Sequence, residues 1–351
     1  MTVGIELPED FSSKSAESVT NKFDALFQEI VTLDNLYQGF LKASKGKRNR
    51  KNVYLFEKNL MTNLNKLKSE LISKTYKPKE CRIFTITCPN SGKMRKIEAP
   101  DFRDAIVQHA IYNHVYWLFD KTFIHDNYGC RIGKGTHKCA DRCQEFLRKC
   151  EGDAYYLQLD FRKYYYSIDR QILSNAIKHQ IKDFPDVCEL MDKFIFTDYE
   201  ENGLGIGNLL SQLFGLIYLN RFDHYIKRVL KIKNYIRYVD DSVLIGLSLQ
   251  EAKVLAKHLE DWCKENLNLE FSKVKIHKIK HGINFVGFRT WRSKRYIRKK
   301  ALQNFSKAVK REKWDSVNAL LEHSFKTTSF SYLINTLNTH NLQNIHKRYK
   351  T

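Results

Sequence analysis

The chain has 351 residues, of which 60 are Lys or Arg and 39 are Asp or Glu, so its formal net charge is +21. This length suggests one large domain or two to three subdomains, and a hydrophobic content of 42% is enough for a core. Because neutralised phosphates release counterions, nucleic acid is the expected partner of so basic a chain. No membrane partner is expected, since the sequence shows no signal peptide and no apolar run of about 18 residues.

The cysteines indicate reduced thiols. Eight are present, at positions 81, 88, 130, 139, 143, 150, 188 and 263, and none forms a Cys-x-x-Cys pair. One group close in sequence could suggest zinc: His137, Cys139, Cys143 and Cys150. Its spacing fits no common zinc motif, so reduced, intracellular cysteines are the better interpretation.

Residues 1–73 predict helices around a basic loop. Apolar residues from Phe23 to Leu41 recur at helical spacing, and residues 53–73 form a second amphipathic pattern. Residues 45–51, between them, are strongly basic. A solvated loop has this composition, but a loop that contacts phosphates is at least as consistent with it. The residues expected to bind nucleic acid there are Lys45, Lys47, Arg48 and Arg50.

From residue 82 the pattern changes to strands. Residues 82–87 and 94–97 flank a turn at Asn90-Ser91-Gly92 and predict a hairpin, after which Asp101 caps a helix through about residue 119. Later helices are expected at 138–150, 169–181, 188–197, 208–230 and 249–267, and strands at 155–160, 234–239, 242–247, 272–279 and 283–289. The C-terminal region is basic and helical. This irregular alternation predicts an α+β sheet with helices packed on one face.

Three carboxylates stand out within this pattern. Asp160 ends an apolar strand, and the adjacent Asp240 and Asp241 lie between apolar stretches. Uncompensated charges are costly in such places, and divalent cations, which prefer oxygen ligands, are their usual occupants. A solvated turn or a salt-bridge cluster is the alternative. One strand-end carboxylate followed by a pair on a hairpin is the arrangement that two-metal nucleotidyl transfer requires.

Motifs in the same order over residues 50–290 resemble those of reverse transcriptases. They are Tyr76 to Ile86, Met94 to Pro100 followed by Asp104 and Gln108-His109, Tyr128 to His137, Leu159 to Ile168, Tyr238-Val239-Asp240-Asp241, Leu267 to Lys275, and Gly282 to Phe288. The resemblance implies an α+β, right-hand polymerase fold with fingers, a palm with an antiparallel sheet, and a helical thumb. Residues 1–50 would be an N-terminal helical extension, 51–150 the fingers, 151–290 the palm with fingers elements inserted at about 170–205, and 291–351 a basic helical thumb.

The resemblance also implies a catalytic centre. Asp160, Asp240 and the backbone carbonyl of Phe161 would bind two Mg²⁺ ions, for which Mn²⁺ could substitute. Asp241 would support the site more than coordinate a metal. Either Lys273 or Lys275 would lie near the leaving pyrophosphate, where a general-acid role and simple solvation are about equally consistent with the pattern.

Further residues would bind the incoming nucleotide. Arg82 and Arg95 would clamp the triphosphate, because a guanidinium fork matches phosphate oxygens, although they could be ordinary surface charges. Tyr165 would block the ribose 2′-hydroxyl and so select deoxynucleotides, unless its ring only packs in the core.

The segment Gly205-Ile206-Gly207 to Ser211-Gln212 is similar, more narrowly, to reverse transcriptases of diversity-generating retroelements. Ile206 stands where enzymes of the group II intron type carry glutamine, and Gln212 where they carry proline. Gly205 departs from the proline that is common in the clade. Ile206, Gly207 and Gln212 would lie at the nucleotide site. Since isoleucine offers no polar contact there, we expect error-prone synthesis, which the resemblance implies to be selective for template adenines; a neutral apolar contact is the alternative.

Basic residues outside the palm are expected to contact nucleic acid: Lys134, Arg292, Lys294, Arg295 and Arg298. The thumb would grip a duplex by its backbone, or its aromatics would form a small core beneath solvated charges. The resemblance implies template RNA, an RNA/DNA duplex, dNTPs, a structured noncoding RNA and a small basic accessory protein as partners. It also implies a cytoplasmic location in a bacterial cell, with the gene bacterial or phage-borne.

Two other functions compete with this interpretation. Related bacterial antiphage-defence reverse transcriptases share the palm motifs and make repetitive or untemplated DNA. A non-catalytic RNA-binding protein on a polymerase fold is disfavoured because all three aspartates are present.

Overall fold

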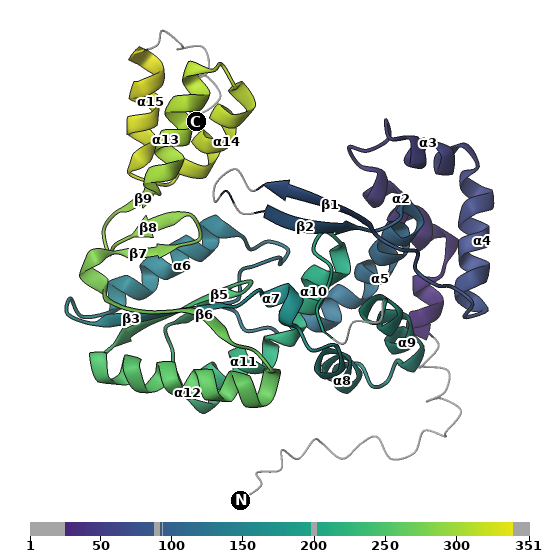
Figure 1. Cartoon of the computed structure of the whole chain (residues 1–351), viewed down its shortest axis with the longest axis horizontal. Helices are drawn as coiled ribbons and strands as arrows, with labels where there is room; N and C mark the ends of the chain where they lie inside the picture. The colour runs from purple at the N-terminus through teal and green to yellow at the C-terminus, as the bar shows by residue number, and fades with distance from the viewer. Residues whose placement is uncertain (1–24, 88–91, 93, 198–201, 340–351) are drawn as a thin grey trace, which may run out of the picture.

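The computed structural model describes residues 25–87, 92, 94–197 and 202–339 (Figure 1). Figure 1 shows helices around a two-stranded hairpin, a central sheet with covering helices, and a C-terminal helical bundle. Helices and antiparallel strands are thus mixed along the chain, which confirms the predicted α+β class.

The N-terminal helices pack around one long helix. After helical residues 25–30 come α2 (Leu33–Ser44), α3 (Lys51–Lys58), α4 (Leu60–Ile72) and the long α5 (Phe102–Asp120). Asp101 caps α5, as predicted, by accepting a hydrogen bond from the Arg103 N–H at 3.1 Å. Gly39 lets α2 approach α5, because a Cβ there would lie 2.7 Å from the Ile106 carbonyl oxygen. The predicted helix 53–73 is two helices, since Asn59 leaves helical geometry with φ −122° and ψ 43°.

The predicted hairpin is present. It consists of β1 (Arg82–Thr87) and β2 (Met94–Ala99), paired antiparallel from Arg82 with Ala99 to Thr87 with Met94. Its strands extend from the helical group toward the C-terminal bundle (Figure 1). Residues Asn90 and Ser91 of the predicted turn lie outside the described residues, as does Phe23.

The central sheet is antiparallel throughout, with the order β4–β5–β3–β6. Its strands are β3 (Tyr155–Phe161), β4 (Tyr235–Tyr238), β5 (Asp241–Leu247) and β6 (Phe271–Lys278). Leu157 and Leu159 belong to one core with α12 (Leu249–Leu267), whereas Tyr156 belongs to another with α6 (Thr136–Lys149). Helices therefore cover both faces of the sheet and not one face as predicted, because successive strand residues are apolar on opposite sides.

The connection between β3 and β4 is helical. It contains α7 (Tyr164–Ser167), α8 (Arg170–Gln180), α9 (Pro185–Ile195), α10 (Leu209–Tyr218), α11 (Asn220–His224) and a π-helical turn (Tyr225–Val229). The prediction of one helix over 208–230 was wrong. Leu219, with ψ 2°, separates α10 from α11, and the π-turn follows directly.

A small second sheet leads into the C-terminal bundle. A 3₁₀ turn (Ile279–His281) precedes β7 (Ile283–Phe285), β8 (Phe288–Thr290) and β9 (Arg295–Ile297). The single strand predicted at 283–289 is thus a hairpin, which turns at Val286 and Gly287 with positive φ. Because β9 pairs with β8, this sheet crosses the predicted palm–thumb boundary at residue 290. The bundle consists of α13 (Lys299–Lys310), α14 (Trp314–Ser324) and α15 (Ser329–Thr339), and residues 340–351 of the predicted helical region lie outside the described part.

Candidate active site

The strand register brings charged residues into one row across the central sheet. Asp160 on β3 pairs with Asp241 on β5 and with Lys273 on β6, so all three side chains lie on the same face. The Lys273 ammonium lies 3.2 Å from Asp160 Oδ2, and the Ser272 hydroxyl donates to the same oxygen at 3.0 Å. The β3–β6 register shifts just after Asp160, at Phe161, whose side chain is buried.

Asp240 lies in the tight turn that joins β4 to β5. Tyr238 pairs with Asp241, which leaves only Val239 and Asp240 in the turn. Val239 has φ +57°, an unusual backbone conformation for a β-branched residue. The sequence-predicted pair of aspartates therefore projects from the end of the sheet where Asp160 also lies.

The electrostatics of this row suit a cation. Burial raises the pKa of Asp240 and the charge of Asp160 adds to this effect, while Arg95 and Arg237 oppose it. Burial also raises the pKa of Asp241, to about 7, against a hydrogen bond that Gln158 Nε2 donates at 3.0 Å. Desolvated carboxylates that repel one another favour a bound divalent ion, which would offset both effects.

The side chains available for a metal are limited. No group of three or more His, Cys, Asp or Glu is arranged as a metal cluster within the described residues. Asp241 is instead turned toward Gln158, so the donors at this edge would be Asp160, Asp240 and a main-chain carbonyl such as that of Phe161. These hard oxygen donors fit Mg²⁺ or Mn²⁺.

The structure separates the two candidate lysines. Lys273 contacts Asp160 directly, whereas Lys275 pairs in register with Gln158, one row away. Both line a polar cavity of about 210 Å³ with Asp160, Asp241, Asn284 and Arg298. Lys273 is therefore the better placed for chemistry at the carboxylates, which the sequence pattern left open.

Tyr165 stands beside the same centre. Burial raises the pKa of its phenol, and Cys130 and the Asp240 carboxylate, which lie near the phenol, add to this effect. A Cβ added to Gly215 would lie 3.1 Å from the Tyr165 ring, so this glycine provides the space that the ring occupies. The side chain is half-buried and packs against the main hydrophobic core.

The loop with Ile206 packs on the β1–β2 hairpin. The Ile206 carbonyl accepts a hydrogen bond from the Glu98 N–H of β2 at 2.8 Å, and the Ile206 side chain is half-buried. Gly207 has φ +122°, and a Cβ there would lie 2.7 Å from the Ile97 side chain, so glycine permits this close approach. Gln212 is exposed on α10.

The two predicted triphosphate ligands share one face of the hairpin. Arg82 pairs with Ala99 and Ile86 with Arg95, which puts both arginines on the same side of the ribbon. Arg95 lowers the pKa of Asp240, so its positive charge acts on the turn between β4 and β5. Arg82 is the first residue of β1, and its guanidinium carbon lies 5.2 Å from the centre of the Phe84 ring.

The residues predicted to contact nucleic acid differ in their exposure and in their internal partners. Arg295 is buried at 4% exposure and binds Asp141 at 2.8 Å and Gln144 at 3.0 Å, so its prediction as a nucleic-acid ligand was wrong. Lys134 has an internal partner, the His125 carbonyl at 2.9 Å. Exposed residues remain available on both sides of the molecule: Lys45, Lys47, Arg48, Arg50, Arg292, Lys294 and Arg298.

The cysteine group is structural. Cys139, Cys143 and Cys150 are buried around α6, and burial raises the pKa of Cys143 to about 12. Thiols with a pKa raised in this way stay protonated, whereas the thiolate is the form that binds a metal. The interpretation of the group as reduced thiols and not as zinc ligands stays a prediction.

Sequence reasoning missed several residues that support the site. Gln158 lies two positions before Asp160, so the period of a strand could have placed it on the same face. Ser272 also contacts Asp160 and Arg237 contacts the Val239 carbonyl, but these contacts depend on strand register and tertiary packing. No helix in the described ranges is long and apolar enough to cross a membrane.

Comparisons with known proteins agree with this geometry. Residues 77–290 match the model of the family described as reverse transcriptase (RNA-dependent DNA polymerase). Protein YkfC of Escherichia coli (strain K12) is 25% identical over 319 residues, which cover 77% of this chain and 82% of that protein. Group II intron-encoded protein LtrA of Lactococcus lactis subsp. cremoris is 26% identical over 240 residues, which cover 64% of this chain but only 39% of LtrA.

A solved structure extends the comparison to the fold. Apo telomerase from Candida tropicalis aligns with a TM-score of 0.50 at 13% identity, over 69% of this chain and 54% of that one. Together with the family match, this likeness confirms the predicted right-hand polymerase fold. Since the match spans more than half of the sequence and includes the row of carboxylates, the chain belongs to the reverse transcriptase family, whose enzymes are RNA-directed DNA polymerases.

Proposed function

We propose that this chain copies RNA into DNA by two-metal nucleotidyl transfer, as the error-prone enzyme of a diversity-generating retroelement. The observation that carries the mechanism is the alignment of Asp160 with Asp241 across β3 and β5, with Asp240 in the adjoining turn. Asp160 and Asp240 would hold the cations with the Phe161 carbonyl. When bound, the cations would activate the primer 3′-hydroxyl and stabilise charge on the α-phosphate.

The chain's own side chains would position the nucleotide. Arg95, whose charge reaches Asp240, would bind the triphosphate, and Lys273, 3.2 Å from Asp160, would approach the leaving pyrophosphate. Tyr165 would lie against the sugar and exclude a 2′-hydroxyl by its bulk.

The thumb offers a basic path for the template–primer. A groove of about 760 Å³ lies between α13 and α14, and its lining includes Arg298, Lys300, Lys307, Arg311 and Lys313. Positive side chains in a groove favour the phosphate backbone irrespective of sequence, as a polymerase that moves along its template requires.

Support for the retroelement subtype comes from Ile206. Its carbonyl is held by β2, the strand that also carries Arg95, so the loop is fixed near the proposed nucleotide site. The side chain can neither donate nor accept a hydrogen bond, and the absence of a polar interaction reduces discrimination between matched and mismatched bases. A structured noncoding RNA, a small basic accessory protein and a cytoplasmic location belong to this proposal.

Primer extension on an RNA template with Mg²⁺ and dNTPs tests the mechanism. Asp240→Asn should lower the rate by at least about a hundredfold, because it removes a charged metal ligand. The exposed Asp183→Asn serves as the matched control and should retain wild-type activity. Equal activity of Asp240→Asn and wild type would contradict the proposal.

Sequencing of the products tests the subtype. Wild type should misincorporate mainly opposite template adenines, Ile206→Gln should reduce these errors, and Ile206→Leu should retain them. An unchanged error spectrum in Ile206→Gln would refute the role of this residue. Repetitive or untemplated DNA from the wild type would instead favour the defence function.

A further inference from the structure

Arg237 is a charged residue in an unusual place. It lies on β4, two positions before Val239, and its side chain is fully buried at 0% exposure. Its partner Asp223, on α11, is also fully buried. Burying an ion pair gives little net stability, because desolvation of both charges offsets their attraction. The pair therefore calls for an explanation other than the stability of the fold.

The guanidinium group connects three segments. Its Nε donates to Asp223 Oδ1 at 2.7 Å and its Nη2 binds Asp223 Oδ2, which forms a bidentate pair. The Tyr235 hydroxyl donates to Asp223 Oδ1 at 2.7 Å and so helps to fix the carboxylate. The remaining nitrogen, Nη1, donates to the Val239 carbonyl at 2.7 Å. This last bond reaches the turn that carries Asp240.

The turn needs such support because its backbone is strained. A β-branched residue with φ near +57° persists only where its surroundings hold it. Gly129 presses on the turn from the other side, since a Cβ there would lie 2.4 Å from the Val239 nitrogen. Val239 is thus confined between the 128–130 loop and the Arg237 guanidinium.

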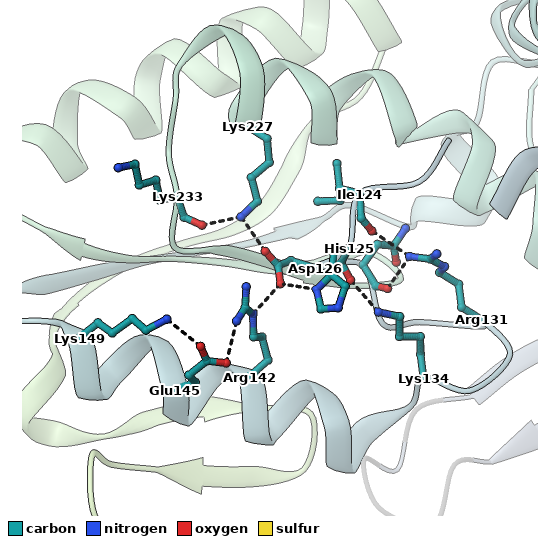
Figure 2. Close-up of polar contacts among 11 residues, drawn as sticks. Ile124, His125, Asp126, Arg131, Lys134, Arg142, Glu145, Lys149, Lys227 and Lys233 are labelled. Atoms are coloured by element: carbon teal, nitrogen blue, oxygen red, sulfur yellow. Dashed lines mark hydrogen bonds and ion pairs between the residues drawn. The ribbon is translucent and has the colours of Figure 1, made fainter. Parts of the chain in front are cut away.

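The main chain of Arg237 is held as firmly as its side chain. Its N–H donates to the Asp126 carbonyl at 3.0 Å, and its carbonyl accepts from the Tyr128 N–H at 2.9 Å. Figure 2 shows Arg142 and Lys227 converging on the Asp126 carboxylate, at 2.7 Å and 2.8 Å. Asp223 and Lys227 lie four residues apart, on α11 and the adjoining π-turn. One short helical segment therefore anchors both the side chain of Arg237 and the loop beside it.

We propose that Arg237 is a positioning residue, which with Asp223 holds the Val239 carbonyl and thereby places the Asp240 carboxylate for metal binding. This inference rests on the proposed metal-binding role of Asp240. It differs from a role in folding, because it assigns the effect to one hydrogen bond between the guanidinium and the turn.

A charge-neutral double variant separates positioning from folding. Arg237→Met combined with Asp223→Asn removes both buried charges, while the asparagine keeps an acceptor for the Tyr235 hydroxyl. Since replacing a buried pair is often neutral for stability, the variant should unfold near the wild-type temperature. Its affinity for Mn²⁺, measured by the paramagnetic resonance signal of the free ion, should fall about tenfold or more. The kcat should fall by about the same factor, with KM for dNTP little changed.

Further variants keep the test decisive. Arg103→Met, which breaks a partly buried pair with Glu70 in the fingers, should leave Mn²⁺ affinity unchanged. Arg237→Lys keeps a charge beside Asp223 but lacks the planar guanidinium, so this variant should fold yet bind Mn²⁺ more weakly. If the double variant does not fold, the Mn²⁺ affinity of Arg237→Lys tests the proposal in its place. Wild-type Mn²⁺ affinity and kcat in either folded Arg237 variant would overturn the proposal. If Asp240→Asn also bound Mn²⁺ as tightly as wild type, the metal role of Asp240 would fail as well.

Discussion

At the scale of single residues, Tyr165 carries a specific consequence. Its ring occupies the space that Gly215 leaves free, and its phenol lies near enough to Asp240 for that carboxylate to raise its pKa. Tyr165→Ala should open room for a 2′-hydroxyl and reduce discrimination against ribonucleotides by about tenfold to a hundredfold. The measurement is the ratio of kcat/KM for a dNTP to that for the matching rNTP.

The neighbouring tyrosine provides the control for this prediction. Tyr166 is exposed, and its hydroxyl donates to the Lys96 carbonyl at 3.1 Å, toward the hairpin and not toward the turn. Tyr166→Ala removes the same atoms and should preserve the dNTP preference. If both variants discriminated like wild type, the ring of Tyr165 would have no role in sugar selection.

Single residues also show what the sequence could reveal of the site. The three aspartates were predictable, because each charge interrupts an apolar strand pattern. The choice of Lys273 over Lys275 was not, since it depends on the β3–β6 register. Arg295 was mispredicted because a sequence displays its charge but not its partner, Asp141, which lies 154 residues away.

At the scale of elements, local sequence patterns predicted the presence of a helix or strand better than the residues at which it begins and ends. The hairpin β1–β2 and the cap of α5 at Asp101 followed from short-range signals and are confirmed. The break of the predicted helix 208–230 at Leu219 carries no such signal, because Leu219 is apolar and buried like the three residues before it, as in an uninterrupted helix. The third strand of the small sheet, β9, forms only through pairing with β8.

The contact of α14 with α6 and β8 predicts a dependence on pH. His323 of α14 stacks on Phe288 with ring centres 4.4 Å apart. The ring centre of His137, on α6, lies 5.9 Å from that of His323. Burial lowers the pKa of both imidazoles. The charge of Arg298 lowers the pKa of His323 further. For His137, Asp141 opposes the effect of burial, whereas Arg295 and Lys326 add to it. Both rings are therefore more readily protonated in the unfolded chain than in the folded one.

The sign of the effect follows from this difference. Stability from these histidines is fully present above their usual pKa of 6.5 and is lost as the pH falls through that value toward the folded-state pKa values. The unfolding temperature should decrease between about pH 7.5 and about pH 5.5, and His323→Phe, which keeps the stacking, should decrease less. The exposed His258→Gln should follow the wild-type curve. Parallel curves for His323→Phe and wild type would contradict this account.

At the scale of the whole molecule, the basic residues behind the net charge of +21 lie in places that differ in their use for nucleic-acid binding. Lys300 and Lys307 of α13 and Arg311, the residue that caps the end of this helix, recur at helical spacing and line the groove between α13 and α14. The same chain carries exposed lysines on α12, which covers the opposite side of the central sheet from α6: Lys253, Lys257 and Lys264. Under the proposed function, the groove set and not the α12 set would meet a duplex that leaves the row of carboxylates.

Two charge-matched triple variants test this asymmetry. Replacing Lys300, Lys307 and Arg311 with Gln should lower affinity for an RNA/DNA duplex and reduce the slope of log K against log salt by about three, roughly one unit for each phosphate that is no longer neutralised. Replacing Lys253, Lys257 and Lys264 with Gln changes the net charge equally and should leave that slope near the wild-type value. The slope is measured by fluorescence anisotropy at several salt concentrations. If the duplex binds along the groove, the groove variant must show the smaller salt dependence. Equal slopes in the two variants would therefore contradict binding along the groove and mean that duplex affinity depends on net charge alone.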